Sequence, residues 1–226
     1  MCPYFLIQVT RKETSLYTGM LAAHYAAART PVGLKRLVIA NSLASIELYK
    51  QGSASLIARF PTEIQENIRK HEAAGTYDSA EYQEGVNLFM KKHVCTLDPW
   101  PQELLQSFQV YEDNKTVYRS MYVGFQLPVG VVTADGYDYL CRFGRSEFTI
   151  DGNLKDWDIV DILHKIPYPT LLISAPEDEA QEVAVLPFFL EIPKVKWVEL
   201  QNSTHLGMFE EPERYCSISP TVYVLC

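Results

Sequence analysis

The stretch that decides the fold runs from Pro169 to Tyr215 and reads PTLLISAPEDEAQEVAVLPFFLEIPKVKWVELQNSTHLGMFEEPERY. A short apolar run at 170–174 ends in an acidic loop, and a second short run at 195–200 leads into a loop with a histidine. Between them, residues 185–192 have the character of a helix. Short apolar runs of this kind are typical of strands buried on both faces. The stretch therefore predicts the closing half of a doubly wound α/β sheet.

The same kind of unit occurs near the start of the chain. Residues 16–28, LYTGMLAAHYAAA, are rich in Ala, Leu and Met, and their apolar positions continue around most of a helix circumference. This pattern predicts a buried helix. Residues 37–40, LVIA, form a short apolar run bounded by polar residues, which predicts another buried strand.

The middle of the chain has a helical pattern from about residue 44 to residue 120. Pro61-Thr62-Glu63 and Ser79-Ala80-Glu81 are typical helix starts, and Gly75 is a typical helix stop. Helices that interrupt a sheet protein predict an inserted cap. We therefore expect three parts: α/β core at 1–43, a helical cap at 44–150 with an atypical insert at 122–145, and further core at 151–226.

Composition excludes several classes of protein. The chain has 226 residues, 47% of them hydrophobic, and 20 basic against 28 acidic residues give a net charge of -8. Since no basic cluster exceeds a pair such as Lys91-Lys92, nucleic acid is not an expected partner. No apolar run approaches the roughly 18 residues that cross a bilayer, so we expect a soluble cytoplasmic protein without a membrane partner. The five cysteines show no zinc-like spacing, and no metal or cofactor is expected.

Two candidate catalytic residues follow predicted strands. Asp178 lies just beyond the strand at 170–174, and His205 lies just beyond the strand at 195–200. In α/β-hydrolases the triad follows the chain order Ser, Asp or Glu, His, and Asp178 before His205 fits this order. Spacing alone leaves the alternative open: an aspartate between Glu177 and Glu179 is often a solvated loop charge, and a single loop histidine often has no catalytic role. His71, His93 and His164 are interpreted as surface or packing residues.

Much of the chain resembles one family. The stretch 169–215 quoted above, HEAAGTYDSAEYQEGVNLFMKKHVCTLDPWP at 71–101 and GNLKDWDIVDILHKI at 152–166 are similar to the proline iminopeptidases. These are serine aminopeptidases of the α/β-hydrolase fold, with relatives that act as amino-acid amidases. The similarity covers residues 17 to about 120 and 146 to 215. It implies an α/β class and an α/β-hydrolase fold that lacks the N-terminal part of its sheet.

The resemblance also implies roles for particular residues. Asp178 and His205 match the triad aspartate and histidine of the family. The family cap supplies acidic residues that bind the free amino group of the substrate, and here Glu147 in Ser146-Glu147-Phe148 matches one of them. Asp98 in the string LDPWP is a second candidate, although a helix N-cap ahead of Pro99 is an equally good interpretation. The implied substrate is a small peptide or amino-acid amide. The sequence predicts no oligomeric state.

The nucleophile is missing from the pattern. Aligning the family elbow G-x-S-x-G on Gly19 and the residues that follow places Leu16 at the serine position, with Thr14 and Thr18 in place of glycines. Ser15 is one position away and does not complete the template. The HGG-type loop that supplies an oxyanion donor has no counterpart either. Because leucine has no nucleophilic atom, we expect the chain to lack the acyl-enzyme route.

Two further stretches depart from the family pattern. Residues 122–145, YVGFQLPVGVVTADGYDYLCRFGR, interrupt the cap, and CSISPTVYVLC at 216–226 replaces a closing helix, which Pro220 disfavours. These departures suggest a product of alternative splicing or gene misprediction. Three functions remain open: a proline iminopeptidase-like serine hydrolase, a catalytically inactive peptide-binding pseudoenzyme, and a fragment without a stable fold.

Overall fold

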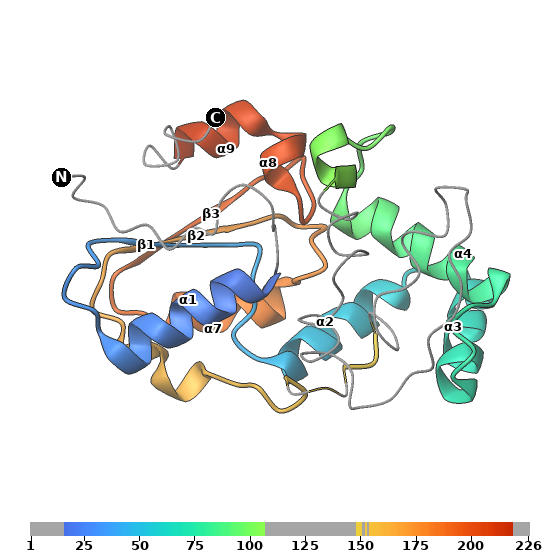
Figure 1. Ribbon diagram of the computed structural model, residues 1–226, viewed down its shortest axis with the longest axis horizontal. Coiled ribbons are helices and arrows are strands. Elements are labelled where there is room, and N and C mark those ends of the chain that lie inside the picture. Colours follow the sequence, from blue (N-terminus) through green and yellow to red (C-terminus); the bar gives the residue numbers. More distant parts are fainter. Residues whose placement is uncertain (1–15, 107–147, 151, 153, 219–226) are drawn as a thin grey trace.

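The core of the protein is a three-stranded parallel sheet. The computed structural model describes residues 16–106, 148–150, 152 and 154–218. The strands are β1 (Leu37–Ala40), β2 (Thr170–Ser174) and β3 (Val195–Glu199), hydrogen-bonded in the order β1-β2-β3 (Figure 1). Ile39 of β1 pairs with Leu172 of β2, which pairs with Trp197 of β3. All three predicted strands are confirmed, and the sheet is parallel as expected.

Helices connect and cover these strands. In chain order they are α1 (Leu16–Arg29), α2 (Ile46–Ile57), α3 (Thr62–Ala74), α4 (Ala80–Phe89), the π-helix η1 (Met90–Val94), the 3-10 helix η2 (Val160–Lys165), α7 (Glu182–Glu191), α8 (Gly207–Glu210) and α9 (Pro212–Ile218). Within the described ranges, no helix is long and apolar enough to cross a membrane. The predicted insert at 122–145, and residues 219–226, lie outside the described residues.

Helices cover both faces of the sheet. Because alternate residues of each strand point to opposite sides, each strand contributes side chains to two clusters. Leu37, Ile39 and Leu172 pack in one core cluster with alanines of α1 and with Phe188 of α7. On the other face, Val38, Leu171 and Ile173 form a cluster with Tyr215 of α9. Figure 1 shows the resulting layers, with α1 and α7 on one side of the strands and α8 and α9 on the other. This three-layer arrangement is the α/β architecture predicted from the sequence.

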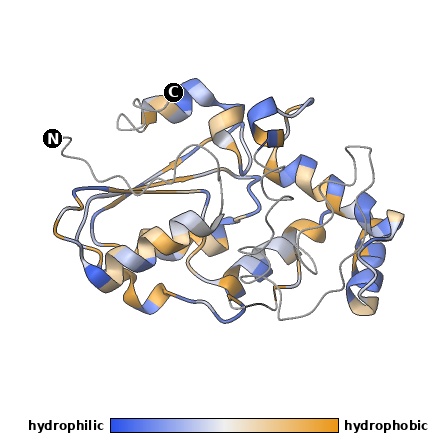
Figure 2. Ribbon diagram, in the orientation of Figure 1, coloured by the Kyte–Doolittle hydropathy of each residue, from blue (hydrophilic) through white to orange (hydrophobic). Residues whose placement is uncertain are grey.

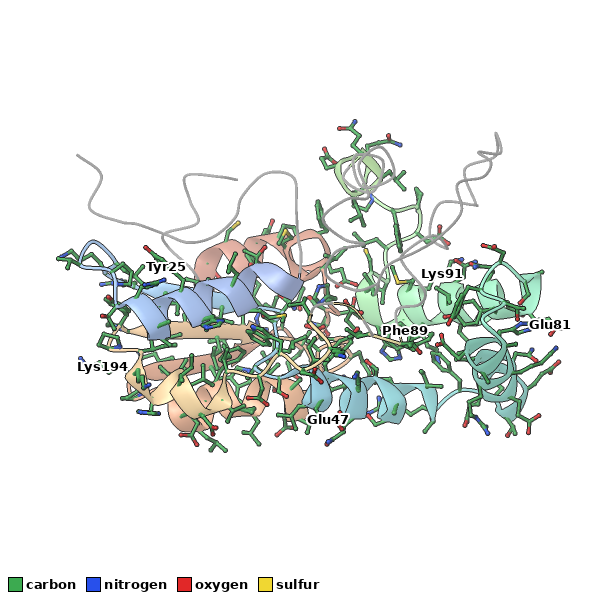
Figure 3. The ribbon with its side chains drawn as sticks, turned by 60° about the horizontal axis from the view of Figure 1, so that its bottom comes forward. Tyr25, Glu47, Glu81, Phe89, Lys91 and Lys194 are labelled. Carbon is green, nitrogen blue, oxygen red and sulfur yellow. The ribbon has the colours of Figure 1, made fainter. Side chains whose placement is uncertain are left out.

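The helices between β1 and β2 pack in two groups. The helix α2 packs against α7, which covers one face of the sheet, whereas α3 and α4 pack against each other. Phe89 at the end of α4 lies between α4 and α2 (Figure 3) and belongs to one buried cluster with Leu56 and Phe60. Figure 2 shows α3 coloured mostly as hydrophilic, as expected for a helix that buries little of its surface against the core.

The predicted helix boundaries in this region are confirmed. Ser79 is the N-cap of α4, and its side-chain oxygen accepts a hydrogen bond from the backbone N–H of Tyr82 at 3.2 Å. Gly75 ends α3 with a φ of 66°, in the left-handed region where a side chain is disfavoured.

One boundary near the end of the chain was not predicted. We expected no helix from Cys216 onward, but α9 continues to Ile218. Pro212 occupies the first position of α9, where its fixed φ favours helix formation, and Tyr215 is buried against the sheet. These two features favour a helix that extends through Cys216, Ser217 and Ile218, the first three residues of the segment 216–226.

Candidate active site

A buried carboxylate lies directly beyond the carboxyl end of β2. Asp178 is completely buried. Its Oδ1 accepts hydrogen bonds from the backbone N–H of Ala180 and from Nδ1 of His205, each at 2.8 Å. Its Oδ2 accepts a hydrogen bond from Nδ2 of Asn41 at 2.7 Å. Three donors compensate the loss of water around the carboxylate, so its orientation is fixed.

The position of Asn41 depends on its backbone. Asn41 follows the last residue of β1 and has a φ of 48°, in the left-handed region that asparagine tolerates better than most residues. In this conformation the chain turns out of the sheet while the side chain reaches Asp178. Sequence reasoning did not identify Asn41. The available signal was a polar residue at the carboxyl end of a buried strand, the same signal that identified Asp178.

The loop after β3 places the imidazole of His205 beside Asp178. His205 is 6% exposed, and its Nδ1 faces Asp178 while its Nε2 lies 3.6 Å from Oε1 of Glu179. Burial opposes protonation of the ring, but the negative charges of Asp178 and Glu179 outweigh this effect and raise the pKa of His205 to about 9. The ring therefore lies between two carboxylates.

Glu179 is the second of these carboxylates, and sequence reasoning treated it only as a neighbouring loop charge. It is 9% exposed, and its Oε2 accepts a hydrogen bond from the hydroxyl of Tyr49 at 3.1 Å. Burial raises the pKa of Glu179, and the charge of Asp178 adds to this effect against the opposing influence of His205 and Tyr49. The run Pro176-Glu177-Asp178-Glu179 contained the residue, but its burial depends on Tyr49 of α2, 130 positions away.

The first turn of α1 lies at the same edge of the sheet. Leu16 is the first residue of α1. A Cβ on Gly19 would come within 2.5 Å of the Ser42 side chain, which follows β1, and Met20 packs in a cluster with Ala180 beside the Asp178 loop. The amino end of α1 is thus close to the loops that follow β1 and β2.

The two predicted amine-binding residues have different outcomes. Glu147 lies outside the described residues. Asp98 is exposed in the loop after η1, and no hydrogen bond or ion pair among the described residues joins it to Asp178, Glu179 or His205. The alternative interpretation of Asp98 as a helix N-cap ahead of Pro99 is wrong, because the next helix begins at residue 102. Trp100 precedes a proline, Pro101, and this disfavours helical backbone at Trp100.

No metal site is present in the part of the chain that the structure describes. No group of three or more His, Cys, Asp or Glu side chains within it could hold a metal ion. The arrangement consists of an imidazole held by one carboxylate, with a second carboxylate next to its other nitrogen, and such an arrangement can hold or transfer a proton.

A parallel sheet covered on both faces, with an aspartate and a histidine bonded across the carboxyl ends of neighbouring strands, defines part of an α/β-hydrolase fold. Solved structures agree. The chain superposes on VinJ with a TM-score of 0.77 and 34% identity, covering 93% of this chain and 64% of VinJ. It superposes on proline iminopeptidase from Mycobacterium smegmatis with a TM-score of 0.75 and 31% identity, covering 88% of this chain and 60% of that one.

The chain is similar in sequence to several curated proline iminopeptidases. It is 31% identical over 201 residues to the proline iminopeptidase of Thermoplasma volcanium, a match that covers 89% of this chain and 60% of the relative. No protein-family profile matches the chain. The chain spans about three fifths of the length of the curated relatives that it matches.

Proposed function

We propose that the chain carries the acid–base and amine-binding half of a proline iminopeptidase-like active site, and that it binds the free amino end of a prolyl peptide or amide. The observation that supports this most directly is the hydrogen bond of 2.8 Å between His205 and Asp178, with the buried carboxylate of Glu179 at the opposite nitrogen of the ring. The homology to proline iminopeptidases supplies the substrate class.

His205 and Asp178 have distinct roles in the proposed site. In a serine hydrolase the Nε2 atom takes the proton of the serine hydroxyl, and the carboxylate holds the ring in the required orientation. Here Asp178 is bonded to Nδ1 and orients the ring, and Nε2 lies next to Glu179. In a complete serine hydrolase site Nε2 would exchange the proton, whereas in this chain, with leucine at the serine position, the pair is proposed to retain only the oriented ring.

Glu179 is the proposed acceptor for the substrate ammonium group. A carboxylate and an ammonium form charge-assisted hydrogen bonds, which are stronger where water is excluded. Glu179 is buried, and His205 is the only positively charged partner found for it among the described residues. Glu147 and Asp98, the residues that the family resemblance suggests, remain proposed as further carboxylates of the same site.

Cleavage is not proposed for this chain. Leu16 begins α1, where the aligned family pattern has its serine, and leucine has no nucleophilic atom. The chain is therefore proposed to bind without forming an acyl-enzyme. Its origin by alternative splicing or misprediction is a separate proposal, which sequencing of the transcript through residues 122–145 and the codons around Leu16 tests directly.

Calorimetric titration of the full chain with L-prolinamide tests the proposed binding. We expect binding at millimolar ligand, no binding of N-acetyl-L-prolinamide, and at least about tenfold weaker binding by Glu179→Gln, because loss of one charge-assisted bond removes about 1.4 kcal/mol or more. Glu177→Gln is the matched control, since Glu177 is exposed and pairs with Arg59. Absence of binding would overturn the proposal.

Hydrolysis is measured with L-proline 4-nitroanilide, together with labelling by a fluorophosphonate. We expect neither product release nor labelling. Release of nitroaniline together with a labelled serine would show that the alignment of the family serine with Leu16 is wrong. That result would favour the hydrolase alternative.

A further inference from the structure

The helix α4 is followed directly by the π-helix η1 (Met90–Val94). The backbone N–H of Cys95 donates a hydrogen bond to the carbonyl oxygen of Met90, five residues earlier, at 3.0 Å. Single π-helical turns within α-helices are uncommon and frequently lie at functional sites. This one turns the chain toward the loops that carry Asp178 and His205.

One carbonyl group in this turn bonds to both loops. The backbone oxygen of His93 accepts the N–H of Glu179 at 3.1 Å and the N–H of His205 at 3.2 Å. The next carbonyl, that of Val94, accepts the N–H of Leu206 at 3.0 Å. The segment that ends the helical region therefore fixes the main chain on both sides of the Asp178–His205 bond.

The side chain of His93 makes a third connection. The ring is 2% exposed, and its Nδ1 lies 2.9 Å from the carbonyl oxygen of Glu177. A carbonyl oxygen only accepts, so the ring hydrogen is on Nδ1. Burial is the largest influence and lowers the pKa of His93, against the bond to Glu177 and its side-chain charge; Arg59 and Lys92 lower it further. Burial therefore favours the neutral ring.

The other ring nitrogen, Nε2 of His93, is buried and makes no hydrogen bond among the described residues. The ring stacks on Phe60 with centroids 5.9 Å apart and lies 5.1 Å from Phe89. A phenylalanine would fill the same apolar space without an unsatisfied nitrogen. What the histidine adds is the N–H bonded to the Asp178 loop.

We infer that His93 is a positioning residue: its ring N–H and its carbonyl oxygen hold the Asp178 and His205 loops in the register that allows the bond between them. The functional meaning of this register rests on the proposed function, but the geometry does not. From the sequence alone, His93 is interpreted as a surface or packing residue. Its bonds reach positions 84 to 112 residues further along the chain, and no local pattern signals them.

Two variants separate positioning from packing. His93→Phe keeps the aromatic contacts and removes the donor. His93→Asn removes the ring but places its Nδ2 where the histidine has Nδ1, so the donor is retained. If His93 only packs, the Phe variant behaves like the parent and the Asn variant is the damaged one. If His93 positions the loops, the Phe variant weakens the bond between Asp178 and His205, and the Asn variant retains it.

The readout is proton NMR of the full 226-residue chain, which requires no substrate. A hydrogen-bonded Nδ1–H of His205 gives a far-downfield resonance, assigned by its absence in His205→Gln. We expect His93→Phe to weaken this resonance and lower the proton affinity of His205 at least about threefold, with an unchanged urea midpoint. We expect His93→Asn to keep the resonance in place while its urea midpoint falls.

His71→Gln is the control, because His71 is also buried but its ring bonds, to Thr76 and Glu81, stay within the α3–α4 region. It should leave the His205 resonance unchanged. A parent-like resonance and proton affinity in His93→Phe would overturn the inference. Should that variant not fold, His93→Asn decides: a retained resonance supports the inference and a lost one overturns it. Failure of prolinamide binding leaves this readout intact.

Discussion

Replacing Glu179 by glutamine should lower the pKa of His205 substantially. Glutamine keeps the shape of the side chain and an oxygen that can accept the Tyr49 hydroxyl, but it removes the negative charge 3.6 Å from Nε2 of His205. The rise of the His205 pKa to about 9 depends on Asp178 and Glu179 together, so one of its two main causes is deleted. The bond to Asp178 is retained, which keeps the ring in place.

The magnitude follows from the distance. Two unit charges 3.6 Å apart interact by about 4 to 5 kcal/mol at an effective dielectric constant of about 20, equivalent to about 3 pKa units. This value is an upper bound, because burial raises the pKa of Glu179 and reduces the charge that it carries when His205 titrates. We expect a fall of about 1 to 3 units in the pKa of His205.

The assay is an NMR titration of the imidazole Cε1–H signal of His205 in the full chain. Glu177→Gln is the control: Glu177 is two residues away, but its side chain is exposed and paired with Arg59. It should move the titration by less than about 0.3 units. If Glu179→Gln leaves the His205 pKa within that same range of the parent value, the ring does not sense Glu179, and the proposed two-carboxylate site is incorrect.

Three further predictions concern stability, measured as the free energy of unfolding in urea. The folded pKa of His205 is raised from 6.5 to about 9, so its contribution is complete below pH 6.5 and is lost as pH rises to 9, a fall of about 3 kcal/mol that His205→Gln should abolish. Asn41→Ala should cost about 1 to 3 kcal/mol, because buried Asp178 loses a donor and alanine is disfavoured at a φ of 48°; a cost below about 0.5 kcal/mol would contradict this account. Gly75→Ala should cost about 1 kcal/mol at a φ of 66°, and Gly75→Asn less; equal costs would contradict the left-handed cap.

The elements that sequence predicted well are those with local causes. Short apolar runs predicted all three strands, and Ser79 and Gly75 predicted the ends of α4 and α3 because capping depends on a few neighbouring residues. The helical end at Ile218 was missed because α9 depends on the burial of Tyr215 against the sheet, which is a tertiary contact. The cap boundaries at 44 and 150 remain a prediction.

In the candidate site too, the residues with a local sequence signal were predicted and those that depend on tertiary contacts were not. Asp178 and His205 could be selected because each follows a buried strand, and the carboxyl ends of parallel strands meet at one edge of the sheet. Their hydrogen bond is observed, while their catalytic role stays a prediction. Asn41, Glu179 and His93 were not selected, although each contacts the pair or its loops.

What distinguishes Glu179 and His93 is the origin of their burial. Glu179 is enclosed by Tyr49 of α2. His93 is enclosed by Phe60, which follows α2, and by Phe89 of α4. A sequence shows that a residue is acidic or basic, but the low dielectric that changes its pKa is created by side chains from other elements. Through Tyr49 and His93 the helical region therefore contributes to the environment of the Asp178–His205 pair, and substitutions in that region should change the titration of His205.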